Sequence, residues 1–219
     1  MKDKKLKLIM TKSEIDNLQL ERQLIQKGYK YICGVDEVGR GPLAGPVVCA
    51  AVIMPLGEND IIEGVTDSKK ISEKKRKVLS AQIMERALSY SICEISPEEI
   101  DEINILEATK KCMKNAVESL KISPEMVFVD ALTLDVNFPQ QSIIKGDAKS
   151  YSIGSASIIA KVYRDNLMEE YAKIYPEYGF EKHKGYGTKA HIDAIKENGP
   201  CLIHRRTFIK NFWVETGKN

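Results

Sequence analysis

Two adjacent carboxylates, Asp36 and Glu37, end an apolar run, residues 31–35, that is typical of a buried strand. Burying an acid costs free energy unless a cation meets it, and a divalent metal ion is the usual partner. The loop Gly39-Arg40-Gly41 follows, and its glycines let main-chain N–H groups approach a ligand closely. A metal site beside a loop suited to sugar-phosphate recognition indicates phosphodiester chemistry.

Two further acids extend this pattern. Asp130 ends another apolar strand, and parallel neighbours would bring Asp36 and Asp130 to one carboxyl edge of a sheet, where sites form in open α/β sheets. Asp165 shares a predicted helix face with core positions, so it points into the protein or at a site. A salt bridge to Lys161 or Arg164 is the alternative for Asp165, and the pattern of residues leaves both readings open.

The donor set decides the kind of metal. Oxygen ligands alone suit Mg²⁺ or Mn²⁺, whereas zinc normally recruits His or Cys. His183, His191 and His204 have no familiar zinc spacing, and we expect them to contact phosphate or solvent. The glycine-rich loop is interrupted by proline and followed by a strand, so it does not fit a dinucleotide-binding loop, which opens a helix. No Gly-x-Ser-x-Gly elbow supports a nucleophilic serine.

The elements that would position these residues follow from the periodicity. Helical spacing, caps and breakers predict helices, and apolar runs between breakers predict strands. The predicted strands are residues 31–36, 47–54, 89–95, 126–130 and 142–145, and the predicted helices are 13–27, 74–87, 103–120, 153–171 and 189–197. Strands first, then alternating helices and strands, indicate an α/β fold with a mixed sheet whose first two strands form a hairpin.

Composition narrows the class of protein. The chain has 219 residues, 43% of them hydrophobic, and no apolar run approaches the roughly 20 residues of a membrane span. Its five cysteines are scattered and never spaced Cys-x-x-Cys, which indicates a reduced, cytoplasmic protein. A net charge of +2 does not by itself argue for nucleic acid. Basic clusters such as His204-Arg205-Arg206, taken singly, fit solvated surfaces.

Together these motifs resemble the ribonuclease HII family, the type 2 ribonucleases H. The resemblance runs from about residue 31 to residue 208, in the expected order. Its motifs are VDEVGRGPLAGP (35–46), DSKK (67–70), EINIL (102–106), ASIIAKVYRD (156–165), YGF (178–180), HKGYGT (183–188) and HRRTF (204–208). The chain departs from the family at Ala131, where glycine often follows the acid, and at Gly154, where alanine is common.

The resemblance implies a ribonuclease H-like fold: a five-stranded mixed sheet flanked by helices, with a C-terminal helical extension. It divides the chain into an N-terminal helical extension, residues 1–30, and a catalytic domain with a C-terminal helical segment, residues 31–219. It also implies four catalytic, metal-binding carboxylates: Asp36, Glu37, Asp130 and Asp165. Asp36 would bridge two ions, Mn²⁺ or Mg²⁺.

The same resemblance implies how substrate binds. Main-chain groups of Gly39, Arg40 and Gly41 would read the 2′-hydroxyl that distinguishes RNA from DNA, and Tyr186 would pack against the sugar at the RNA–DNA junction. Candidate phosphate contacts are Lys69, Lys161 and Lys184. The expected activity is endonucleolytic: cleavage of RNA in RNA–DNA hybrids and nicking on the 5′ side of ribonucleotides in duplex DNA. The products would carry 3′-hydroxyl and 5′-phosphate ends.

Three alternatives are weighed against this expectation. Ribonuclease HIII carries a folded N-terminal domain and usually a glutamate at the fourth acidic position, whereas this chain has about thirty residues before its first strand and has Asp165. A catalytically silent nucleic-acid binder would not need four metal-binding acids. A resolvase or transposase of the same fold would have no 2′-hydroxyl to read. We expect a monomer without membrane association, and the sequence leaves open whether a replication-clamp protein docks on a terminus.

Overall fold

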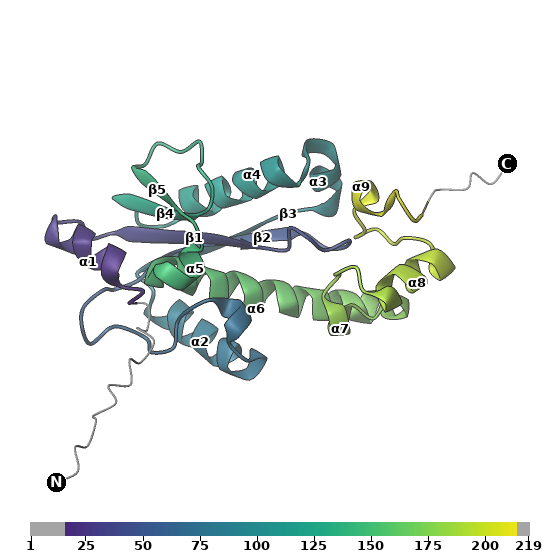
Figure 1. The fold of residues 1–219 in the computed structure, drawn as a ribbon, viewed down its shortest axis with the longest axis horizontal. Helices are drawn as coiled ribbons and strands as arrows, with labels where there is room; N and C mark the ends of the chain where they lie inside the picture. The colour runs from purple at the N-terminus through teal and green to yellow at the C-terminus, as the bar shows by residue number, and fades with distance from the viewer. Residues whose placement is uncertain (1–15, 214–219) are drawn as a thin grey trace, which may run out of the picture.

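The computed structural model describes residues 16–213, and a five-stranded mixed sheet runs through its middle (Figure 1). The spatial order of the strands is β3-β2-β1-β4-β5. Their bounds are β1 Ile32–Val38, β2 Val47–Ile53, β3 Ser89–Ile95, β4 Met126–Asp130 and β5 Gln140–Ile143. β1, β2 and β3 pair antiparallel as a meander, and β4 and β5 add in parallel beside β1. The predicted fold class and the hairpin between the first two strands are confirmed.

Helices cover both faces of this sheet (Figure 1). One face packs against α4, whose buried Cys112 and Met113 join the inward residues of β1, β2 and β4. The other face packs against α2 and α6 through residues such as Leu79 and Ile158. The helix bounds on these faces are α2 Glu73–Arg86, α3 Pro97–Ile103, α4 Ile105–Glu118, α5 Gly146–Lys149 and α6 Tyr151–Ile174.

The single helix predicted over 103–120 is instead two helices, α3 and α4. Asn104 between them has a φ of 68°, which ends α3, and its side chain accepts hydrogen bonds from the N–H groups of Leu106 and Glu107 at the start of α4. With a ψ of 162° this backbone conformation is strained for a residue other than glycine, and a helix cannot continue through it, whereas the Asn side chain caps the following helix well. The apolar periodicity continues across the break, which is why it did not reveal the boundary.

The remaining helices lie at the two ends of the sheet (Figure 1). α1 (Gln19–Gln26) lies at one end. The helix predicted over 13–27 is shorter than expected, since residues 16–18 are not helical, and its predicted start at residue 13 falls outside the described residues. A separate apolar cluster at the other end includes Tyr178 and Phe180. It combines Met168 of α6 and Ala44 with residues of the short helices η2 Pro176–Tyr178, α7 Phe180–His183, α8 Lys189–Asn198 and α9 Arg206–Ile209. In the described part of the chain, no helix is both long and apolar enough to span a membrane.

Candidate active site

Three carboxylates meet where β1 and β4 run side by side. The parallel register pairs Val35 with Val129, so the next residues, Asp36 and Asp130, lie side by side on the two strands. One ligand oxygen each from Asp36, Glu37 and Asp130 lies within 4.8 Å of the others. The register of the two strands therefore produces the acidic group that their sequences predicted.

The electrostatics of this group favour a bound cation. Burial raises the pKa of the Asp36 carboxyl well above its ordinary range, the charge of Glu37 raises it further, and the Ser157 hydroxyl opposes the shift. Burial also raises the pKa of Glu37, an effect that Arg40, 3.6 Å away, partly offsets. A divalent ion would relieve this cost, because it favours the charged form of every carboxylate around it. The all-oxygen donor set fits Mg²⁺ or Mn²⁺.

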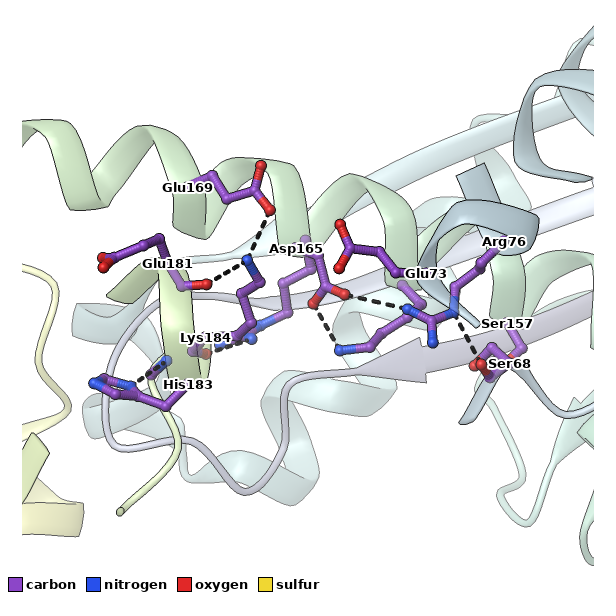
Figure 2. Close-up of polar contacts among 12 residues, drawn as sticks. Ser68, Glu73, Arg76, Ser157, Asp165, Glu169, Glu181, His183 and Lys184 are labelled. Carbon is purple, nitrogen blue, oxygen red and sulfur yellow. Dashed lines mark hydrogen bonds and ion pairs between the residues drawn. The ribbon is translucent and has the colours of Figure 1, made fainter. Parts of the chain in front are cut away.

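Asp165 lies on α6 and is held by two cationic side chains (Figure 2). Lys161, one turn earlier, donates to its Oδ1 at 2.6 Å, and Arg76 of α2 lies 3.4 Å from Oδ2. The salt bridge to Lys161 that the sequence allowed is therefore present, whereas Arg164 points elsewhere. Among residues 16–213, the close acidic group does not include Asp165. A metal ion would have to compete with Lys161 and Arg76 for this carboxylate.

The Gly39–Gly41 loop and Tyr186 lie against each other. A β-carbon built on Gly41 would lie 3.8 Å from Cε1 of Tyr186, with nothing closer. The two loops are joined because the N–H of Leu43 donates to the carbonyl oxygen of Gly185 at 2.8 Å. Tyr186 is 43% exposed, so its ring is available to a ligand beside the loop. The structure thus brings together two segments, about 145 residues apart in sequence, that the resemblance implies for substrate binding.

Comparison with known proteins identifies the family that carries this site. A model described as Ribonuclease HII matches residues 33–216. The chain belongs to the ribonuclease HII family. It is 55% identical over 194 residues to Ribonuclease HII from Caldicellulosiruptor saccharolyticus, covering 88% of this chain and 94% of the relative. It is 54% identical over 208 residues to the protein of that name from Ligilactobacillus salivarius, covering 94% and 81%.

Solved structures agree with this membership. The ribonuclease H2 of Pyrococcus horikoshii OT3 is 30% identical with a TM-score of 0.67, covering 81% of this chain and 93% of that one. The ribonuclease HII in a complex with PCNA from Archaeoglobus fulgidus is 27% identical with a TM-score of 0.70, covering 84% and 98%. Ribonucleases HII are endonucleolytic hydrolases of the RNA strand in RNA–DNA hybrids, and this chain is an endoribonuclease of that family.

The three lysines proposed as phosphate contacts have different surroundings in this ribonuclease HII. Burial lowers the pKa of Lys69, but the negative charges of Asp147 and then Asp36 outweigh it and raise the pKa overall. The ammonium group of Lys161 is bound to Asp165. That of Lys184 is bound to Glu169 at 2.7 Å, as Figure 2 shows. Lys161 and Lys184 would therefore have to exchange a carboxylate for a phosphate.

The expectation that the histidines contact phosphate or solvent is wrong for His191 and His204, which are buried against each other. The backbone N–H of Cys201 donates to Nδ1 of His204, so the proton of His204 sits on Nε2 and is donated to Nε2 of His191 at 3.0 Å. Nδ1–H of His191 then donates to the carbonyl oxygen of Tyr186 at 3.0 Å. Burial lowers the pKa of His191 to about 4 and that of His204 to about 3, so both are neutral and hold the Tyr186 loop.

Two residues of the site were missed by sequence reasoning. Arg76 belongs to a basic run that resembles a solvated helix face, yet it is buried and donates to the carbonyl oxygens of Ser68 and Ile71. Asp147 lies beside the acidic group, and its pKa is raised first by burial and then by the charges of Asp67 and Asp130. The position of Asp147, soon after the end of β5, was the available signal, because strands also supply Asp36, Glu37 and Asp130 near their ends.

Proposed function

We propose that this ribonuclease HII is a divalent-metal-dependent endonuclease that cleaves RNA in RNA–DNA hybrids and nicks duplex DNA on the 5′ side of an embedded ribonucleotide. The products would carry 3′-hydroxyl and 5′-phosphate ends. The proposed cellular role is removal of RNA primers and excision of ribonucleotides from DNA, in the cytoplasm. The observation that carries the proposal is the apposition of Gly41 and Tyr186 beside three convergent carboxylates.

In this proposal the four acids bind the metal ions. Asp36, Glu37, Asp130 and Asp165 would hold two ions, Mn²⁺ or Mg²⁺. When bound, the ions would lower the pKa of the attacking water and stabilise the leaving 3′ oxygen. Asp165 lies on the 24-residue helix α6, whereas the other three acids lie on strands β1 and β4.

Substrate selection would fall to the loops. The main chain of residues 39–41 would bind the 2′-hydroxyl, and the Tyr186 ring would stack on the neighbouring deoxyribose. Lys69 would contact phosphate, together with Lys161 and Lys184 once their carboxylate partners are released. One 2′-hydroxyl would suffice for recognition, so a single ribonucleotide would be a substrate. A DNA-cutting nuclease of the same fold is the second candidate, and it would be indifferent to that hydroxyl.

Three duplexes of one sequence test the proposal: an RNA–DNA hybrid, a DNA duplex with one ribonucleotide, and an all-DNA duplex. We expect the first two to be cut with Mg²⁺ or Mn²⁺, the third to stay intact, and nothing to be cut after chelation. Cleavage of the all-DNA duplex would support the second candidate. Cleavage that persists without divalent ions would contradict the metal assignment.

Asp36→Asn is the matched variant for this assay. The amide keeps the acceptor for the N–H of Glu37, at 2.8 Å, but removes the charge that would bridge both ions. We expect kcat to fall about a thousandfold or more, and the rise in melting temperature on adding Mn²⁺ to shrink, because binding to the native state is what produces it. Substantial turnover with unchanged metal dependence would rule out the bridging role.

A replication-clamp protein is a further proposed partner, since the Archaeoglobus fulgidus structure is a complex with PCNA. Light scattering would measure the molar mass of the chain alone and of the chain mixed with the replication clamp from the same organism. The first measurement tests the expected monomer, and the second tests the proposed partner. A complex that forms only in the mixture supports the partner, and two separate species contradict it.

A further inference from the structure

Two buried guanidinium groups lie beneath the loop of residues 39–46. Arg164 and Arg205 have no measurable exposure. Neither forms an ion pair with an acid among residues 16–213. Instead their N–H groups donate to backbone carbonyl oxygens. Burying a cation in this way costs free energy, and burial lowers the pKa of Arg205 to about 9. Because this arrangement costs free energy, we expect the hydrogen bonds of the two guanidinium groups to have a functional role.

Arg205 contacts the loop of residues 39–46, called the recognition loop below, through all three nitrogens of its guanidinium group. Nη2 donates to the carbonyl oxygen of Gly39 at 2.6 Å, and Nη1 donates to that of Arg40 at 3.0 Å. Nε and Nη2 both donate to the carbonyl oxygen of Gly45, at 3.0 and 2.8 Å. Arg205 therefore fixes three carbonyl oxygens of one loop from a position about 165 residues later in the chain.

Fixing these carbonyl groups also fixes the N–H groups of the same peptides. In a trans peptide the C=O and N–H bonds point in opposite directions, and no cis peptide occurs in the described chain. The carbonyl of Gly39 shares its peptide with the N–H of Arg40, and that of Arg40 with the N–H of Gly41. Both N–H groups therefore point away from Arg205. The residues that carry them, Arg40 and Gly41, are exposed. Within the described residues neither has a protein acceptor.

We propose that Arg205 is a positioning residue that turns the N–H groups of Arg40 and Gly41 toward the substrate, and so sets the selectivity for a ribonucleotide. This inference rests on the proposed function, in which that backbone binds the 2′-hydroxyl. Arg164 has a different task, because its donors reach the carbonyl oxygens of Ala44, Pro46 and Lys184 and so join the two loops. Among residues 16–213, Arg205 alone donates to the carbonyl oxygens of the two peptides that would face the sugar.

Arg205→Lys is the test, because lysine keeps the positive charge but lacks the planar fork that reaches three acceptors. Arg206→Lys is its matched control: the neighbouring arginine is exposed and its guanidinium lies over the Trp213 ring, 5.4 Å from the centroid. Fluorescence anisotropy without divalent ions would measure Kd for two DNA duplexes that differ only by one ribonucleotide. The readout is the ratio of the two Kd values.

For the wild type and Arg206→Lys we expect tighter binding of the ribonucleotide duplex. In Arg205→Lys the ratio should fall about tenfold toward one, since two oriented hydrogen-bond donors are lost, while Kd for the all-DNA duplex stays unchanged. An unchanged ratio, or equal weakening on both duplexes, would overturn the inference. A wild-type ratio of one would instead contradict the proposed function.

A measurement on the wild type covers the case in which Arg205→Lys does not fold. In ¹⁵N-labelled full-length protein, the amide signals of Arg40 and Gly41 should shift on adding the ribonucleotide duplex and shift less with the all-DNA duplex. Equal shifts with both duplexes would show that these N–H groups do not distinguish a ribonucleotide, which would contradict the proposed function together with the inference that rests on it.

Discussion

At the scale of single residues, Gly39 and Gly41 of the recognition loop have different reasons to be glycine. Gly39 has a φ of +94°, and a β-carbon there would lie 2.3 Å from Nε of the buried Arg164. Gly41 has no such clash, since its nearest neighbour would be the Tyr186 ring edge at 3.8 Å. The first glycine serves packing, and the second keeps open the space that the proposed substrate would occupy.

This difference predicts opposite behaviour for two alanine variants. Gly39→Ala should lower the free energy of unfolding by about 1–3 kcal/mol, because the backbone is strained and Arg164 must move. Gly41→Ala should stay within about 0.5 kcal/mol of the wild type, yet lose about tenfold or more in kcat/KM on the single-ribonucleotide duplex. Urea denaturation and steady-state kinetics would measure both. Wild-type activity in Gly41→Ala would show that the gap to Tyr186 is not used.

Which residues could be predicted from the sequence depended on whether their environment is local. Asp36 and Asp130 were predictable because an acid at the end of an apolar strand must meet something polar. The burial of Arg205 could not be predicted, because nothing in a run of basic residues shows which side chains lie in water and which lie in the core. Its burial comes from acceptors about 160 residues away. The catalytic roles of the acids stay a prediction.

Ala131 is a case in which the sequence comparison was informative. It stands where the family often has glycine, and its φ is 52°, in the left-handed region that disfavours a β-carbon. This chain therefore accepts local strain next to Asp130.

At the scale of elements, the N-terminal helix α1 is tied to the helix that carries Asp165. Glu21 of α1 is fully buried, and its Oε1 accepts hydrogen bonds from the Ser150 hydroxyl at 2.6 Å and the Ser152 N–H at 3.0 Å. Both donors lie at the start of α6, so Glu21 satisfies the N–H of Ser152, which the helix cannot satisfy itself, and also binds the Ser150 hydroxyl. Its Oε2 has no partner among the described residues. The extension thus contributes to the frame that holds the site.

This contact predicts a pH dependence of stability. Burial raises the pKa of Glu21 above 4.5, although its hydrogen bonds oppose the shift. Between pH 4.5 and the raised pKa the folded state binds more protons than the unfolded state, so rising pH destabilises the fold. The free energy of unfolding of the wild type, relative to Glu21→Gln, should therefore fall from pH 4.5 toward neutrality. Urea titrations of both proteins give this difference, and a flat or rising difference would contradict the account.

The helices themselves were predicted well where caps and periodicity agreed. Ser72 caps α2 just before the predicted start of this helix at residue 74, accepting from the N–H of Lys75. The prediction for β5 was shifted by two residues, because Gln140 and Gln141 lack the apolar pattern of an inner strand. β5 is an edge strand that pairs only with β4 in the sheet, so its side chains need not be apolar.

At the scale of the whole molecule, the C-terminal segment closes over the first hairpin. The N–H of Gly45 donates to the carbonyl oxygen of Ile203, and the N–H of Arg205 donates to that of Leu43. The residues proposed to bind substrate, 39–41 and Tyr186, therefore come from segments far apart in the chain that are hydrogen-bonded to each other. This arrangement is the basis of the proposal that the enzyme recognises an RNA–DNA junction, in which the loop of residues 39–41 would bind a 2′-hydroxyl and Tyr186 would contact the neighbouring deoxyribose.

The junction account predicts different effects for two substitutions of Tyr186. Tyr186→Ala should reduce kcat/KM on the single-ribonucleotide duplex about tenfold or more, since stacking on the sugar is lost, whereas Tyr186→Phe should stay within about threefold of the wild type. The comparison separates the ring from the hydroxyl. Equal losses in the two variants would assign the effect to the hydroxyl and contradict stacking.

The position of the cut tests the central claim most directly. End-labelled DNA duplexes with one ribonucleotide, and matched duplexes with a long RNA tract, would be cleaved with Mg²⁺ and with Mn²⁺ and the fragments sized. The account predicts a single cut at the phosphate on the 5′ side of the lone ribonucleotide, and in the tract a cut on the 5′ side of its last ribonucleotide, leaving 3′-hydroxyl and 5′-phosphate ends. A cut on the 3′ side, or an uncut single-ribonucleotide duplex, would contradict it.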